Sequence, residues 1–128
     1  MPEAVRRLTG GRGADVVYDP VGGAAGNAAL RCLANEGRFL AVGFAAGSWP
    51  RFDAQRLVIG NTSAVGVYAG AYTRAERLAM LDALGALVAK GALAPTVTPV
   101  AFEDLPAALA DVAAGVSCGR PVYIAREM

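Results

Sequence analysis

Three glycine-containing segments of this chain each follow a short apolar run. They are 19–23 (DPVGG), 42–47 (VGFAAG) and 65–72 (VGVYAGAY). Because glycine has no Cβ, such segments can bring peptide N–H and C=O groups directly against a flat or extended ligand. Taken alone, each segment is better explained as an ordinary turn from a strand into a helix. Three of them at one sheet edge indicate a binding site.

Side chains for acid, base or nucleophilic chemistry are scarce. The sequence holds no histidine, which removes the commonest general base and every Ser-His or Cys-His relay. Its two cysteines, Cys32 and Cys118, are far apart and form no CxxC pair, which disfavours a zinc site. Cys32 lies within ALRCLA and is better explained as a small buried thiol than as a nucleophile. We therefore expect neither a metal nor a catalytic side chain.

The composition is that of a globular protein. The chain has 128 residues, 55% of them hydrophobic and 18% charged, which supplies ample apolar material for a core. A net charge of +1 without a clustered Lys/Arg face argues against nucleic acid as a partner. No apolar stretch approaches the roughly 20 residues that cross a bilayer, and the N-terminus lacks the apolar centre of a signal peptide. We expect a soluble, cytoplasmic protein without a membrane partner.

Strands and helices alternate along the sequence. Short apolar runs predict strands at 14–18, 38–44, 63–68 and 121–126. Helical patterns are predicted at 2–9, 24–37, 54–60, 73–91 and 103–115. This alternation indicates an α/β fold with parallel strands joined by right-handed crossovers. Three such strands are expected to form the second half of a doubly wound, Rossmann-like sheet with flanking helices, in one partial domain spanning 1–128.

Local signals mark where several of these helices begin and end. Asp53 is placed to cap the helix at 54–60, and Gly37 stands where the helix from 24 would have its C-cap. Thr73, with Glu76 three residues on, predicts a capping box at the start of the clearest amphipathic helix.

In sheets of this type, ligands bind at the carboxyl ends of the strands, beside the topological switch point. All three glycine-containing segments are expected at that edge. No GxGxxG opens a strand-turn-helix unit, however, since GGRG and GFAAG have different spacing. The helix N-terminus that cradles a pyrophosphate is therefore expected outside this chain.

Four stretches together resemble a known family. They are GGRGADVVYDPVGG, LRCLANEGRFLAVGFAAG, VGVYAGAY and GRPVYI. They resemble the C-terminal part of the zinc-free NAD(P)H-dependent quinone oxidoreductases, a branch of the medium-chain dehydrogenase/reductase superfamily. The resemblance implies strands four to six of a Rossmann domain and the returning C-terminal segment. It also implies that the glycine-rich loop and the GroES-like catalytic domain are absent.

The resemblance implies a nicotinamide cofactor, NADP or NAD, and a set of contacts to it. Pro20, Val21 and Gly22 would form the wall beside its ribose; Gly43, Phe44 and Ala45 would lie near the nicotinamide; and the backbone of Val67, Tyr68 and Ala69 would hold the carboxamide. Arg120 would approach the pyrophosphate or simply be a solvated surface arginine. Tyr18, Tyr68 and Tyr72 are weaker candidates for protonating a quinone oxygen. Tyr18 is better explained as a strand side chain packed against a helix, and Tyr68 and Tyr72 as lining or covering the cleft. NADPH and NADH are not distinguished, since the residues that read the 2′-phosphate belong to the other half.

Two functions of different class follow from the resemblance. In the first, the chain is half of a cofactor-binding domain whose complete polypeptide passes hydride from NAD(P)H to a quinone or enone, and it is inactive alone. In the second, it is a dimerisation or assembly module. The strand at 63–68 would then pair with its copy in a homodimer, and the apolar edge of the strand at 14–18 would recruit a separate N-terminal half.

Overall fold

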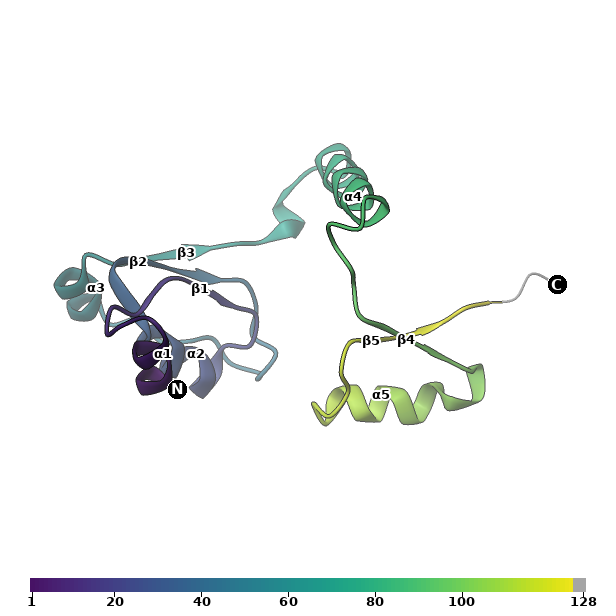
Figure 1. The fold of residues 1–128 in the computed structure, drawn as a ribbon, viewed down its shortest axis with the longest axis horizontal. Helices are drawn as coiled ribbons and strands as arrows, with labels where there is room; N and C mark the ends of the chain where they lie inside the picture. The colour runs from purple at the N-terminus through teal and green to yellow at the C-terminus, as the bar shows by residue number, and fades with distance from the viewer. Residues whose placement is uncertain (126–128) are drawn as a thin grey trace. The chain divides into compact units, whose positions relative to one another are not determined.

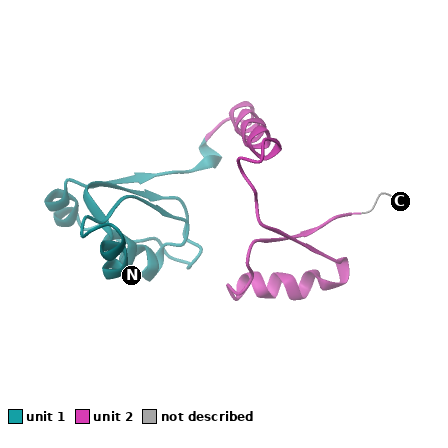
Figure 2. Ribbon diagram, in the orientation of Figure 1, with its two compact units in different colours: residues 1–71 teal, residues 72–128 magenta. Residues whose placement is uncertain are grey.

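The computed structural model describes residues 1–125, and within them the chain forms two compact units that are each described here separately. Unit 1 comprises residues 1–71, and unit 2 begins at Tyr72 (Figure 2). Within residues 1–125, no helix is both long and apolar enough to cross a bilayer.

Unit 1 is a three-stranded parallel sheet with helices packed on it (Figure 1). Its strands are β1 (Ala14–Asp19), β2 (Leu33–Ala41) and β3 (Ser63–Gly66), in the order β1-β2-β3. Its helices are α1 (Pro2–Leu8), α2 (Gly23–Leu30), α3 (Ala54–Gly60) and the short 3-10 helix η1 (Ala69–Ala71). Helix α2 packs against β1 and β2, and α3 packs against β2. The predicted α/β class and parallel pairing are confirmed.

The core of unit 1 is small and centres on Phe39, whose side chain is fully buried. Cys32, Ala34 and Pro50 are also buried, so the prediction of a buried thiol at Cys32 is confirmed. The ring of Phe39 meets that of Phe52 edge to face, with 5.4 Å between centroids, which is a favourable aromatic geometry.

The opposite face of the sheet is open in unit 1. Tyr18, Leu40 and Val65 stand in one cross-strand row on this face. Tyr18 is 65% exposed, and its strand neighbour Val16 is 56% exposed. The expectation that Tyr18 packs against a helix is therefore not met within unit 1.

The predicted helix at 24–37 is wrong in its second half. Helix α2 ends at Leu30, and β2 has already begun at Leu33. The register slips between the pairs formed by Ala14 and Val16, which marks a bulge in β2. Glu36 has a positive φ there, and a Cβ on Gly37 would lie 2.9 Å from the Ala34 carbonyl oxygen. Glycine at position 37 thus allows backbone segments to lie close together in the sheet, and it is not a helix C-cap.

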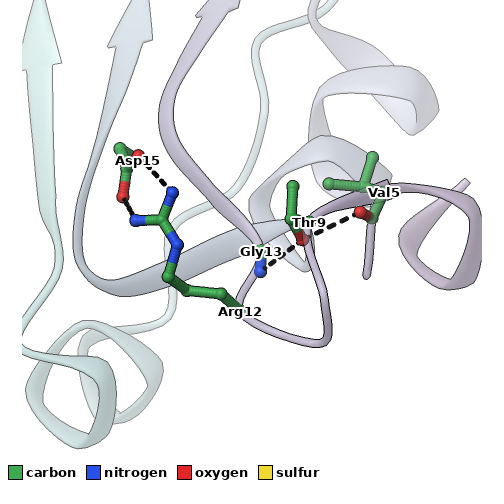
Figure 3. A network of polar contacts seen from close by, with 5 residues as sticks. All are labelled: Val5, Thr9, Arg12, Gly13 and Asp15. Carbon is green, nitrogen blue, oxygen red and sulfur yellow. Dashed lines mark hydrogen bonds and ion pairs between the residues drawn. The ribbon is translucent and has the colours of Figure 1, made fainter. Parts of the chain in front are cut away.

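A compact polar turn joins α1 to β1 (Figure 3). The hydroxyl of Thr9 donates to the Val5 carbonyl and accepts from the Gly13 N–H, both at 2.9 Å. Arg12 makes a two-pronged ion pair with Asp15 at the surface. These contacts stop α1 and direct the chain into the first strand.

Unit 2 contains two helices and a pair of parallel strands, β4 (Val97–Val100) and β5 (Arg120–Tyr123). Helix α4 spans Arg74–Ala89, the 3-10 helix η2 spans Phe102–Asp104, and α5 spans Leu105–Ala113. The sequence patterns did not predict the strand β4. The final strand begins at Arg120 and ends at Tyr123, and the last predicted strand residue, Arg126, lies outside the described residues.

The predicted capping box at the start of α4 is confirmed. The Thr73 hydroxyl accepts from the Glu76 N–H, and the Glu76 carboxylate accepts from the Thr73 N–H. The hydrogen bond from the Thr73 side chain, followed by that from its backbone, holds the pKa of Glu76 below its ordinary value. The Asp53 cap on α3 is confirmed as well, since Asp53 accepts from the Gln55 N–H at 3.0 Å.

Candidate functional site

The carboxyl ends of all three strands of unit 1 lie at one edge of the sheet. Asp19, Ala41 and Gly66 form a single cross-strand row at that edge. The segments that follow them are the three glycine-containing stretches that the sequence singles out. Their expected placement at one edge is therefore confirmed for the strands.

Backbone hydrogen bonds join the segment after β1 to the segment after β2. Ala45 and Ala46 donate to the carbonyls of Pro20 and Val21, at 3.2 and 2.9 Å. In the reverse direction, Gly23 donates to the Ser48 carbonyl at 2.8 Å. Residues 20–23 and 42–48 thus form one structure, here called the paired loops.

Glycine allows the paired loops to approach each other. At Gly22, where φ is +70°, an added Cβ would collide with the carbonyl oxygen of Ser48. At Gly43, an added Cβ would lie 2.7 Å from the Pro20 carbonyl oxygen. Any side chain at either position would push the loops apart. The packing of the two loops against each other, and not contact with a ligand, therefore explains at least part of the need for glycine at positions 22 and 43.

A buried carboxylate holds the first of the paired loops. Asp19 is only 5% exposed, and its Oδ1 accepts from the N–H groups of Val21 and Gly22 at 3.0 and 2.9 Å. Its Oδ2 is buried beside Gly26 and has no hydrogen-bond partner among residues 1–125. Sequence reasoning missed this role, although an Asp two residues before the accepted N–H is a common turn signal.

Backbone N–H groups without a partner among residues 1–125 lie at this edge after both β2 and β3. The amides of Phe44, Tyr68 and Ala69 have no hydrogen-bond partner within the described part of the chain. Phe44 follows β2, and the other two follow β3, so these donors belong to adjacent strand ends. By contrast, the N–H groups of Val21 and Gly22 are already used by Asp19. Donors for a ligand are therefore available after β2 and β3. After β1, residues 20–22 offer mainly the half-exposed Val21 side chain, and N–H groups unpaired in the described chain begin only at Ala24 and Ala25 in α2.

Aromatic side chains border the free donors. Phe44, 51% exposed, lies against Trp49, with 4.7 Å between their ring centroids. Tyr68 is 75% exposed and folds back over Gly70, whose hypothetical Cβ its ring would clash with. These rings present flat apolar surface next to hydrogen-bond donors, which suits a planar amide-bearing ligand.

Arg120 opens β5 in unit 2, where its N–H donates to the Thr96 carbonyl at 2.9 Å. Its side chain is exposed. Its proposed approach to a pyrophosphate stays a prediction, as do the roles of the other predicted contact residues.

The described residues do not offer a metal site. Within residues 1–125, no three acidic, cysteine or histidine side chains are grouped so that they could hold an ion. Cys32 is buried in unit 1 and Cys118 is exposed in unit 2, and both are free thiols.

The family model described as "Zinc-binding dehydrogenase" matches residues 2–122. A curated relative, the quinone oxidoreductase-like protein 2 of Bos taurus, is 47% identical over 72 residues, which are 56% of this chain and 21% of the relative. The chain thus spans about a fifth of the length of the curated relatives that it matches.

Solved structures agree with the match to the dehydrogenase family model. A quinone oxidoreductase of Pseudomonas syringae matches with a TM-score of 0.80 and 26% identity, over 98% of this chain and 40% of that one. A mycobacterial protein solved in complex with NADPH matches with a TM-score of 0.81 and 30% identity, over 97% of this chain and 40% of that one. The resemblance to quinone oxidoreductases of the medium-chain dehydrogenase/reductase superfamily is confirmed, and the chain belongs to the zinc-binding dehydrogenase family.

Proposed function

We propose that the carboxyl edge of the unit 1 sheet is one side of a nicotinamide dinucleotide site. The observation that carries the proposal is the set of free N–H groups on Phe44, Tyr68 and Ala69, at the ends of two adjacent parallel strands. Parallel sheets bind such ligands at this edge. A structural neighbour, the mycobacterial protein solved with NADPH, supports the choice of cofactor.

In a longer polypeptide, this site would serve the reduction of a quinone or enone. The bound dihydronicotinamide supplies the hydride, and the residues of this chain would bind and orient it. The backbone of Val67, Tyr68 and Ala69 would hold the carboxamide, and Gly43, Phe44 and Ala45 would lie beside the ring. Pro20, Val21 and Gly22 would face the ribose, and Arg120 the pyrophosphate. Because the chain spans about a fifth of its curated relatives, we propose that it is inactive alone.

Zinc has no place in this proposal, since the chain lacks histidine and its described residues group no metal donors. A cytoplasmic location is proposed from the composition alone.

Titration of the purified chain with NADPH tests the proposed site. Trp49 is the sole tryptophan and contacts Phe44, so its emission should change saturably as the ring site fills. Replacing Ala69 with proline removes one free donor at the first residue of η1, a position that tolerates proline. We expect NADPH binding to weaken about tenfold, the effect of losing one hydrogen bond of about 1.4 kcal/mol.

The matched control is Ala54→Pro, at the first residue of α3 after the extended Asp53. That position lies away from the paired loops and η1, so Ala54→Pro should leave the dissociation constant unchanged. A folded chain that gives no saturable signal, or the same weakening in both variants, contradicts the proposed site.

A second candidate function is assembly through the sheet edges. Within residues 1–125, β1 and β3 each pair only with β2, so both outer edges are open. Because Val67 donates to the Ala41 carbonyl, the N–H groups of Ala64 and Gly66 point away from β2, toward the free edge of β3. We propose that this edge pairs with a second copy of the chain.

Light scattering during gel filtration measures this assembly. The native chain should elute as a dimer at micromolar concentration. Ala64→Pro deletes one outward N–H at an edge position that tolerates proline, and should shift the chain toward monomer while far-UV circular dichroism stays unchanged. A native monomer, or a dimer indifferent to Ala64→Pro, counts against pairing through β3.

A further inference from the structure

A cavity of about 700 Å³ lies in unit 1, away from the proposed nicotinamide site. Its lining includes Leu33, which opens β2, and Thr62, which precedes β3. It therefore lies at the amino ends of these strands, whereas the free N–H groups lie beyond their carboxyl ends. Helix α3 contributes five of the remaining lining residues, and the others come mainly from α2, β2 and the segment before α3.

Arginines from three separate helical elements converge on this cavity. Arg6 comes from α1, Arg31 caps the C-terminus of α2, and Arg56 comes from α3. All three residues also line a second cavity of about 530 Å³. Arg51, just before α3, lines the larger cavity as well.

These four guanidinium groups are poorly neutralised. Asp53 is the only carboxylate among the residues that line the larger cavity, and it already accepts from the Gln55 N–H. Glu3 lines only the smaller cavity. In the described part of the chain, the one ion pair joins Arg12 to Asp15, and none involves the four arginines. Positive charges gathered in this way repel one another, and a bound anion would relieve that repulsion.

We propose that this arginine-lined cavity binds a polyphosphate anion, free or as part of a nucleotide. Guanidinium groups present a planar fork that pairs with two phosphate oxygens at once, and several forks suit a ligand with several phosphates. One N–H of Arg31 is held by the Asn27 carbonyl at 3.1 Å, which fixes the direction of that side chain. The half-buried apolar side chains of Leu30, Leu33 and Leu57 also line the cavity and would contact a nucleoside if one is attached.

Calorimetric titration with inorganic triphosphate, and separately with ATP, tests the proposal on the full chain. Both should bind, equally if only phosphate is recognised and more tightly for ATP if the apolar lining takes part. Arg56→Ala and Arg31→Ala should each weaken binding tenfold or more, because each removes a charge-assisted hydrogen-bond donor. The matched control Arg77→Ala, on α4 in unit 2, should change the dissociation constant less than twofold.

Two further results separate this cavity from the nicotinamide site. Ala69→Pro should leave triphosphate binding unchanged, and Arg56→Ala should leave the Trp49 response to NADPH in place. The proposal is overturned if millimolar triphosphate and ATP give no heat of binding. It is also overturned if Arg77→Ala weakens binding as much as Arg56→Ala, because attraction to net charge alone would then explain the signal.

Discussion

Replacing Phe39 with alanine is expected to cost unit 1 about 3–5 kcal/mol of unfolding free energy, the usual cost of removing a fully buried phenylalanine. Phe39 is the one side chain with no exposed surface in the described chain, and it shares the buried apolar core with the smaller Cys32, Ala34 and Pro50. Because small domains have marginal stability, the variant should be largely unfolded at room temperature.

Urea unfolding followed by Trp49 emission measures this effect, since the only tryptophan lies in unit 1. Phe52→Ala is the matched comparison. Phe52 contacts Phe39 edge to face but is 41% exposed, so its loss should cost only on the order of 1 kcal/mol. Equal losses in the two variants would show that the core does not centre on Phe39.

Gly22→Ala is expected to have the second largest effect on the free energy of unfolding, and it should also disturb the proposed site. Gly22 has φ 70° and ψ −152°, a conformation essentially restricted to glycine, so a side chain there costs on the order of 1–3 kcal/mol. The new Cβ would also collide with the Ser48 carbonyl, so the paired loops must separate, at a further cost of about 1–3 kcal/mol. Trp49 directly follows the loop that moves, and its emission should change in the folded state.

Gly10→Ala isolates the part of this effect that comes from the loops. Gly10 has φ +62°, and no atom lies within 4 Å of its hypothetical Cβ. The Gly10→Ala variant should therefore lose only the unfolding free energy that backbone strain costs, and it should leave NADPH binding unchanged. If both variants lose the same unfolding free energy in urea, the close approach of the paired loops contributes nothing.

Local signals in the sequence predicted most of the elements. The capping box of Thr73 and Glu76, and the Asp53 cap, depend on residues within one helical turn, so the sequence states them directly. The predicted end of α2 was wrong because Leu33 and Ala34 continue the helical spacing, and Gly37 resembles a helix C-cap. Residues from Leu33 onward form a strand because they pair with β1. A Cβ on Gly37 would lie 3.0 Å from the Ala14 carbonyl oxygen, a contact that no local pattern reveals.

The sequence predicted the position of the candidate site but not its contacts. Glycines at strand ends indicated where a ligand could approach, and the parallel sheet brings those ends to one edge. The sequence could not show that Gly22 and Gly43 face the other loop, since their neighbours Ser48 and Pro20 are more than twenty residues away in the chain. Nor could it predict the arginine-lined cavity, because Arg6, Arg31 and Arg56 are widely spaced and each alone resembles an ordinary surface residue.

The β1-β2-β3 order of the unit 1 sheet coincides with the order in which the strands leave the ribosome. Chains emerge at about 5–20 residues per second and fold from the N-terminus as they do so. Strands β2 and β3 therefore each meet a neighbour that has already been synthesised, and only β1 waits for a partner made later. The sheet can grow during translation by adding one strand at a time to a growing edge.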